Sequence, residues 1–217
     1  MPRQTQASRG SGSPWTLGIV VALCVANAGL LSGAPAFAQA LARWLEYDRS
    51  AILDGQWWRL VTGNFVHWSP EHFLLDAGAF LFVGLLYERR LRRAYPWLLL
   101  TSALAVGCGA MALLPDMQTY RGLSGVDSGQ FAAALCVEAE LARRDRSRWL
   151  WLAPVAAVFA AKLLFEAGTG QMLFGTQSLG NIGVPVPLSH AAGTASALGL
   201  LTCLRMLDLT PGRRLAA

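Results

Sequence analysis

Long apolar stretches alternate with short polar, arginine-rich stretches along most of the chain. A helix needs roughly 20 mostly apolar residues to cross the hydrocarbon core of a bilayer. Six stretches approach this length, which predicts an all-α membrane protein with a six-helix bundle. The predicted spans cover about residues 15–39, 69–87, 97–115, 122–142, 149–166 and 187–206.

The basic residues predict how this bundle is oriented. Seventeen of the 18 are arginines, and Lys162 alone lies well inside a span. Thirteen arginines fall on the side that holds both termini, and four on the other. Because cytoplasmic loops carry the excess of positive charge, both termini are predicted to be cytoplasmic. The domain plan is then a tail over 1–14, a membrane domain over 15–206 and a tail over 207–217.

Composition excludes the other broad classes of protein. Charged residues make up 14% of the chain, against roughly 25% in a soluble domain, and mean hydropathy is +0.40. Disorder is excluded by the large apolar fraction, 54%. The net charge of +5 comes from short clusters between apolar runs, so it does not indicate nucleic-acid binding. Four cysteines lie in apolar segments, and we predict that they are buried and unpaired.

The beginning of the predicted membrane domain allows two interpretations. Its apolar stretch ends in the small-residue sequence Ala36–Ala40, which resembles a signal-peptide cleavage site. The stretch is long for a signal peptide, so we favour a retained helix. The following outer segment, about 41–67, mixes tryptophans with charges, and we expect it to lie partly in the headgroup layer.

Ionisable residues inside spans are rare and usually mark function. Here they are His72, Asp76, Asp127, Glu138, Glu140, Lys162, Glu166 and His190. Both Glu138 and Glu140 lie close to a cytoplasmic arginine cluster and are expected to be interfacial. Lys162 and Glu166 are four residues apart on one helix, so we interpret them as a structural pair.

The remaining groups share a depth in the membrane. The predicted topology puts His72, Ser124 and His190 close to the outer ends of three different spans. Ser124 begins a helix, where free backbone N–H groups favour an oxyanion. Small residues at 125, 129 and 133 form a stripe that allows a second helix to approach closely.

A matching stripe predicts which helix approaches. Gly193 and Ala197 lie on the same helix face as His190. Close packing of the two stripes would bring His190 within hydrogen-bonding distance of Ser124. A serine beside a histidine is a nucleophile with its general base.

These residues together resemble the rhomboid family of intramembrane serine proteases. The similar segments follow the family order: Gly55–Thr62 with its Trp-Arg pair, His67–Asp76, Gly84 with Glu88, Tyr120–Gly125, and Ser189–Gly193. The resemblance implies that Ser124 is the nucleophile and His190 the base, in a dyad without a third carboxylate. It also implies an oxyanion hole built from the backbone N–H of Ser124, with Gly122 and Leu123 nearby, and from the side chain of His72.

Two acidic residues depart from this pattern. The family usually has asparagine four residues after the first of these histidines, where this chain has Asp76. An ionised carboxylate repels an oxyanion, so we expect Asp76 to lie beside the site. Asp127 lies three residues after Ser124; it could share a proton or orient His190, but we favour a bond to a neighbouring helix.

A narrower resemblance concerns the substrate. The Tyr120–Gly125 run and the pair Lys162 and Glu166 resemble rhombosortase, a bacterial rhomboid subgroup, while Asp127 and Ser128 depart from it. The resemblance implies transmembrane protein substrates, including ones with a C-terminal Gly-Gly sorting tail. The expected reaction, acyl-enzyme formation at Ser124 followed by hydrolysis, uses no metal and no cofactor, and the richness in arginine and alanine fits a bacterial inner membrane as the location.

Two other functions compete with this one. A catalytically inactive rhomboid-like protein that binds membrane clients would account for Asp76. A small transporter using Asp76, Asp127 and the histidines as a proton relay would leave the serine and histidine motifs unexplained. The motifs therefore favour the protease.

Overall fold

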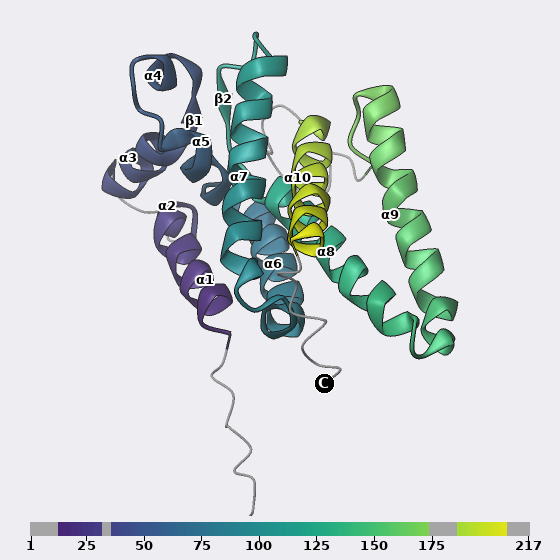
Figure 1. Cartoon of the computed structure of the whole chain (residues 1–217). Coiled ribbons are helices and arrows are strands. Elements are labelled where there is room, and N and C mark those ends of the chain that lie inside the picture. Colours follow the sequence, from purple (N-terminus) through teal and green to yellow (C-terminus); the bar gives the residue numbers. More distant parts are fainter. Residues whose placement is uncertain (1–12, 32–35, 174–185, 208–217) are drawn as a thin grey trace, which may run out of the picture.

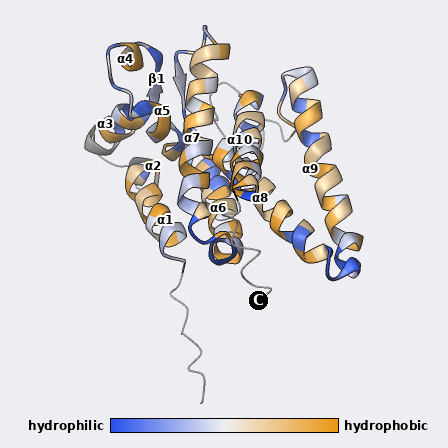
Figure 2. Cartoon of the chain, viewed as in Figure 1, coloured by the Kyte–Doolittle hydropathy of each residue, from blue (hydrophilic) through white to orange (hydrophobic). Residues whose placement is uncertain are grey.

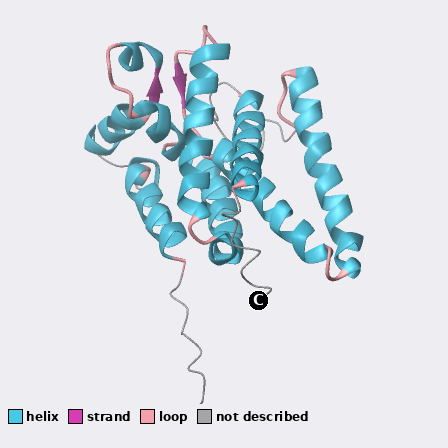
Figure 3. Cartoon of the chain, in the orientation of Figure 1, coloured by secondary structure: helices cyan, strands magenta, loops and turns pink. Residues whose placement is uncertain are grey.

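The computed structural model describes residues 13–31, 36–173 and 186–207 (Figure 1). The predicted tails, 1–14 and 207–217, lie outside these residues except for positions 13, 14 and 207. The helices are α1 (Pro14–Ala26), α2 (Ala28–Leu31), α3 (Ala36–Leu45), α4 (Arg49–Leu53), α5 (Arg59–Thr62), α6 (Pro70–Leu91), α7 (Ala94–Leu113), α8 (Ser124–Ala142), α9 (Trp149–Thr169) and α10 (Pro187–Met206). Two 3-10 turns, η1 (Gly63–Phe65) and η2 (Arg146–Arg148), and two short strands, β1 (Tyr47–Asp48) and β2 (Thr119–Tyr120), complete the structure (Figure 3).

Helices that could cross a membrane are present among the described residues. By length and hydropathy, α7 and the stretch Arg146–Thr169 qualify. The pair Arg59–Phe65 and Pro70–Leu91, bent by 99°, gives a third candidate if it is one span. With 19 and 20 residues, α8 and α10 have the lengths of spans, but their small and polar residues lower their hydropathy. The chain is an integral membrane protein, while the count of six spans stays a prediction.

The predicted first span differs from the observed helices. Instead of one continuous helix over 15–39, α1 ends at Ala26 and the short α2 follows. Asn27 interrupts the helix because its side chain amide donates to the carbonyl oxygens of both Leu23 and Phe65, each at 2.8 Å. The interruption ties this part of the chain to the segment that leads into α6.

Polar connections gather at one end of the bundle. The turn between α6 and α7 and the connection between α8 and α9 lie at the same end and are hydrophilic (Figure 2). Both carry arginines, Arg92 and Arg93 in the first and the cluster 143–148 in the second. This placement agrees with the sorting of arginines in the sequence, while the side of the membrane that this end faces stays a prediction.

The outward surfaces of the helices are apolar. Large exposed side chains include Phe82 on α6, Trp97 on α7, and Leu150 and Val158 on α9. In a membrane protein such surfaces contact lipid chains and need no protein partner. The same exposure corrects one prediction: Cys24, Cys108 and Cys203 are exposed and Cys136 is half-buried, so the four cysteines are not all buried.

The closest packing joins α8 to α10. A Cβ on Gly125 would lie 2.8 Å from the carbonyl oxygen of Ser189, and one on Gly129 would lie 2.8 Å from that of Gly193. A Cβ on Gly193 would overlap the carbonyl oxygen of Gly125. The predicted contact between the two small-residue stripes is therefore confirmed, and it leaves no room for side chains between the helix backbones.

A buried glutamate attaches α1 to the bundle. Glu88 of α6 accepts the backbone N–H groups of Trp15 and Thr16 at 3.1 and 2.9 Å, and the Thr16 hydroxyl at 2.6 Å. These backbone groups belong to the first turn of α1 and lack intrahelical acceptors. A carboxylate there also complements the helix dipole. Gly84, one turn earlier, leaves the space that the Thr16 side chain occupies.

The outer segment holds the strand that leads into α8. β1 pairs with β2 in antiparallel register, Tyr47 opposite Tyr120. Arg59 is buried and donates to the carbonyl oxygens of Arg43 and Glu46, each at 2.8 Å. Arg121, directly after β2, forms an ion pair with Glu46 at 2.8 Å. The segment is therefore anchored at both strands, which fixes the approach of the chain to Ser124.

The glycine contact predicts a sharp difference between two alanine substitutions on α10. Gly193→Ala places its Cβ on the Gly125 carbonyl, so we expect a loss of about 1–3 kcal/mol of stability. Gly199→Ala, on the same helix, meets nothing within 4 Å and serves as the control. Thermal denaturation in detergent measures both. Equal melting temperatures for the two variants would contradict the packing described.

Candidate active site

Ser124 and His190 lie together at the N-terminal ends of α8 and α10. The His190 Nε2 is 3.0 Å from the Ser124 Oγ, within hydrogen-bonding distance. Ser124 is the first residue of α8 and His190 lies in the first turn of α10. His190 is buried, and Ser124 is partly exposed. The glycine contact between the two helices sets this distance, as the sequence predicts.

The turn before Ser124 depends on glycine. Gly122 has φ 144°, a conformation that residues with a Cβ rarely adopt. Its carbonyl accepts the Tyr120 hydroxyl at 2.8 Å, and its N–H donates to the carbonyl oxygen of Gly63 at 3.3 Å. Burial raises the pKa of Tyr120, so its hydroxyl stays protonated and available as a donor. A Cβ on Gly122 would also lie 3.0 Å from the His72 ring.

Asp76 holds the backbone next to the serine. Its Oδ2 accepts the N–H of Leu123, the buried residue before Ser124, at 2.9 Å. The carboxylate thus lies beside the site, as the sequence predicts, and acts there as an acceptor. The Leu123 N–H, expected close to the oxyanion hole, is therefore already bonded. The N–H groups of Ser124 and the next two residues belong to the first helical turn and have no intrahelical acceptor.

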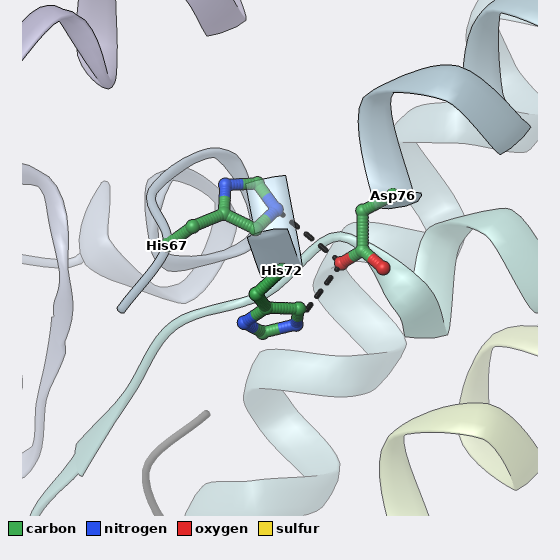
Figure 4. Close-up of side chains that lie close together, drawn as sticks. All are labelled: His67, His72 and Asp76. Atoms are coloured by element: carbon green, nitrogen blue, oxygen red, sulfur yellow. Dashed lines mark hydrogen bonds and ion pairs between the residues drawn. The ribbon is translucent and has the colours of Figure 1, made fainter. Parts of the chain in front are cut away.

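Two histidines face the same oxygen of Asp76 (Figure 4). His67 Nε2 and His72 Nε2 each lie 3.3 Å from Asp76 Oδ2. The other ring nitrogen of His67 lies 3.3 Å from the Asn27 Oδ1, which is also an acceptor. Both contacts of His67 can be hydrogen bonds if the ring is protonated, or if Asp76 carries the proton and donates it to Nε2. The Nδ1 of His72 is buried without a hydrogen-bond partner among the described residues.

This cluster is also a candidate cation site by its donors. The ligand atoms of His67, His72 and Asp76 lie within 4.8 Å of one another. A tetrahedral zinc ion with bonds of about 2.0–2.1 Å needs donor separations of roughly 3.3 Å, close to the two separations observed. Two arrangements would therefore account for the short distances to Asp76. Either a cation lies between the three side chains, or His67 or Asp76 carries a proton.

The favoured bond from Asp127 to a neighbouring helix is not seen for its Oδ1, which is buried without a hydrogen-bond partner among the described residues. The two ring nitrogens of His190 contact Ser124, Glu166 and Lys162 instead. A role for Asp127 in orienting His190 therefore has no support from these contacts.

Glu166 is the site residue that sequence reasoning missed. Its Oε2 lies 2.7 Å from His190 Nδ1, on the side of the ring opposite Ser124. Lys162 Nζ lies 2.8 Å from the same oxygen and also 2.8 Å from His190 Nδ1. The predicted ion pair is present, and it also contacts His190, so a carboxylate lies beside the dyad where none was expected. The signal available in the sequence was the presence of two charged residues, four positions apart, inside an otherwise apolar helix.

A comparison with protein families agrees with the motifs of the sequence. A family model described as Rhomboid domain matches residues 54–204. The matched part contains Ser124, His190, Asp76 and Glu166, and it begins after α4, so that it excludes α1 to α4. No curated protein matches the chain.

Metal removal tests the cluster around Asp76. Because a serine activated by a histidine needs no metal, we expect a fluorophosphonate probe to label Ser124 equally before and after EDTA treatment. Ser124→Ala, unlabelled under both conditions, is the control. Labelling that disappears with EDTA and returns with Zn²⁺ would instead assign a required metal to the cluster.

Proposed function

The chain belongs to the rhomboid family, and we propose that it is an intramembrane serine endopeptidase acting through Ser124 and His190. The observation that carries this proposal is the 3.0 Å contact between the Ser124 Oγ and His190 Nε2 at a helix start. A nucleophile, a base and unpaired backbone donors within one site are the parts that acyl transfer needs.

The reaction follows from these positions. Ser124 Oγ attacks the carbonyl carbon of the scissile peptide while its proton moves to His190 Nε2. The tetrahedral oxyanion is bound by the backbone N–H groups that begin α8, with His72 beside it. The C–N bond then breaks and His190 gives the proton to the departing amine. Water attacks the acyl-enzyme, His190 takes its proton, and the ester breaks with return of that proton to Ser124.

The substrate is a transmembrane protein cut close to the outer membrane face. The backbone of a helix in lipid hides its carbonyl groups in hydrogen bonds, so it must unwind before attack. Glycines at the cut site lower the cost of unwinding, by up to about 1 kcal/mol per residue relative to alanine. The Gly-Gly sorting tail implied by the rhombosortase resemblance has this chemistry, and the bacterial inner membrane is the proposed location.

One observation favours the alternative, a catalytically inactive member that binds membrane clients. Asp76 holds the Leu123 N–H, which brings a carboxylate beside the place where an oxyanion would develop. Repulsion between the two negative charges would slow the first step of catalysis. The intact Ser124–His190 contact favours the protease over this alternative.

Removal of either partner of the dyad tests the proposal. We expect Ser124→Ala and His190→Ala to abolish fluorophosphonate labelling and to lower cleavage of a Gly-Gly-tailed membrane substrate by at least about 10³-fold. Ser128→Ala is a matched control, because its hydroxyl donates to the carbonyl of Ser124 one turn away and, among the described residues, reaches neither reactive atom of the dyad. A folded wild type that neither labels nor cleaves would contradict the protease and favour the client-binding alternative.

Asp76→Asn separates the two roles of that side chain. The amide oxygen of Asn can still accept the Leu123 N–H, while the negative charge disappears and an N–H donor is gained. We expect kcat to rise by about tenfold, which is less than the roughly 10²–10³-fold effect of one well-placed oxyanion donor. Asp76→Ala, which removes the acceptor as well, should lower kcat. A kcat that falls in both variants would show that the charge on Asp76 is needed.

A further inference from the structure

The proposed protease reaction uses Ser124 and His190, but it leaves one buried acid in contact with the dyad unexplained. Glu166 of α9 is 1% exposed, and its Oε2 lies 2.7 Å from His190 Nδ1. Its other oxygen accepts the backbone N–H of Leu173 at 3.3 Å. Both oxygens are therefore held, and the orientation of the carboxylate is fixed from two directions.

Lys162 creates a competition at the same ring nitrogen. Its Nζ lies 2.8 Å from both Glu166 Oε2 and His190 Nδ1. If Lys162 donates to Nδ1, the neutral ring must carry its proton on Nε2, and it then cannot accept the proton of Ser124. If Nδ1–H donates to Glu166 instead, Nε2 presents its lone pair to the serine. Only the second arrangement can activate the nucleophile.

The carboxylate decides this competition. A hydrogen bond from a ring N–H to a carboxylate is charge-assisted and is stronger than one between neutral groups. The ammonium of Lys162 also keeps its own bond to Glu166 in this arrangement, so neither charge is left alone. The three groups then hold the ring of His190 in the tautomer that the reaction needs.

We propose that Glu166 is a positioning residue that completes a Ser124–His190–Glu166 triad, with Lys162 held away from His190 by the same carboxylate. The proposal rests on the proposed protease function. When Ser124 attacks, its proton moves to Nε2 and the imidazolium keeps its Nδ1–H bond to Glu166. Glu166 stays ionised and stabilises the positive ring, and no further proton is transferred to it.

Glu166→Gln tests the proposal most directly. The neutral amide accepts the ring N–H weakly, and Lys162 loses its counter-charge and becomes the donor to Nδ1. We expect kcat to fall by roughly 10²–10⁴-fold, as for a histidine held in the wrong tautomer. KM for the membrane substrate should stay within about twofold, because Glu166 touches the base and not the substrate.

A double variant separates positioning from a structural role. In Lys162→Met with Glu166→Gln, the competing ammonium is absent, and the amide oxygen alone can accept Nδ1–H. We therefore expect the double variant to recover at least about tenfold in kcat over Glu166→Gln. Rates are measured per folded enzyme, with the folded fraction taken from gel filtration and melting temperature.

Glu138→Gln is the matched control. Glu138 is equally buried and forms ion pairs with Arg90 and Arg148, at 2.8 and 2.7 Å. It lies about 20 Å along α8 from Ser124, at 1.5 Å per residue. We expect this variant to melt earlier than wild type while its kcat per folded enzyme stays unchanged.

The outcomes distinguish failure of this proposal from failure of the protease function. If wild type is labelled by the fluorophosphonate and Glu166→Gln keeps its kcat, Glu166 is structural and the triad is excluded. The triad is equally excluded if Glu166→Gln and the double variant lose activity only in proportion to folded protein. If wild type itself neither labels nor cleaves, the protease function fails first.

Discussion

The contact between α8 and α10 is the constraint on which the site depends. Gly193 lies against the carbonyl of Gly125, and Gly129 against the carbonyl of Gly193, so the two backbones touch without side chains between them. Because Ser124 and His190 begin these helices, the same contact determines the distance between their reactive atoms. Dispersion forces from such close approach are a main source of helix association in lipid, where no hydrophobic effect drives it. Packing and chemistry therefore share one set of glycines.

Much of this arrangement could be predicted from the sequence because it depends on local rules. Small residues every four positions define a helix face, and a span that begins outside places its first turn at the outer surface. Those two rules were enough to bring Ser124 and His190 together. Glu88 was found only as part of a resemblance, and its bonds to the first turn of α1 are a contact between distant segments that no local pattern contains.

The parts that sequence reasoning missed depend on which of several contacts a side chain makes. Lys162 and Glu166 are spaced as an ion pair on one helix, and they do form one. This spacing does not predict which neighbouring helix the pair faces. That depends on the rotation of α9 about its axis, which is set by its packing against α8 and α10. The interruption at Asn27 was missed for a similar reason, since its acceptor at Phe65 lies 38 residues away.

The charges around the dyad divide the site into two unequal halves. On the side of the base, Glu166 faces the ring that becomes positive and Lys162 compensates the carboxylate, so the charge that develops on His190 meets an opposite charge. On the side of the oxyanion, Asp76 faces the backbone of Leu123, and its two histidines can offset its charge only when one of them carries a proton. Buried charges interact more strongly than charges in water, so neither effect is screened away. Activation of the nucleophile is thus well supported, and the oxyanion becomes the more demanding half of the reaction.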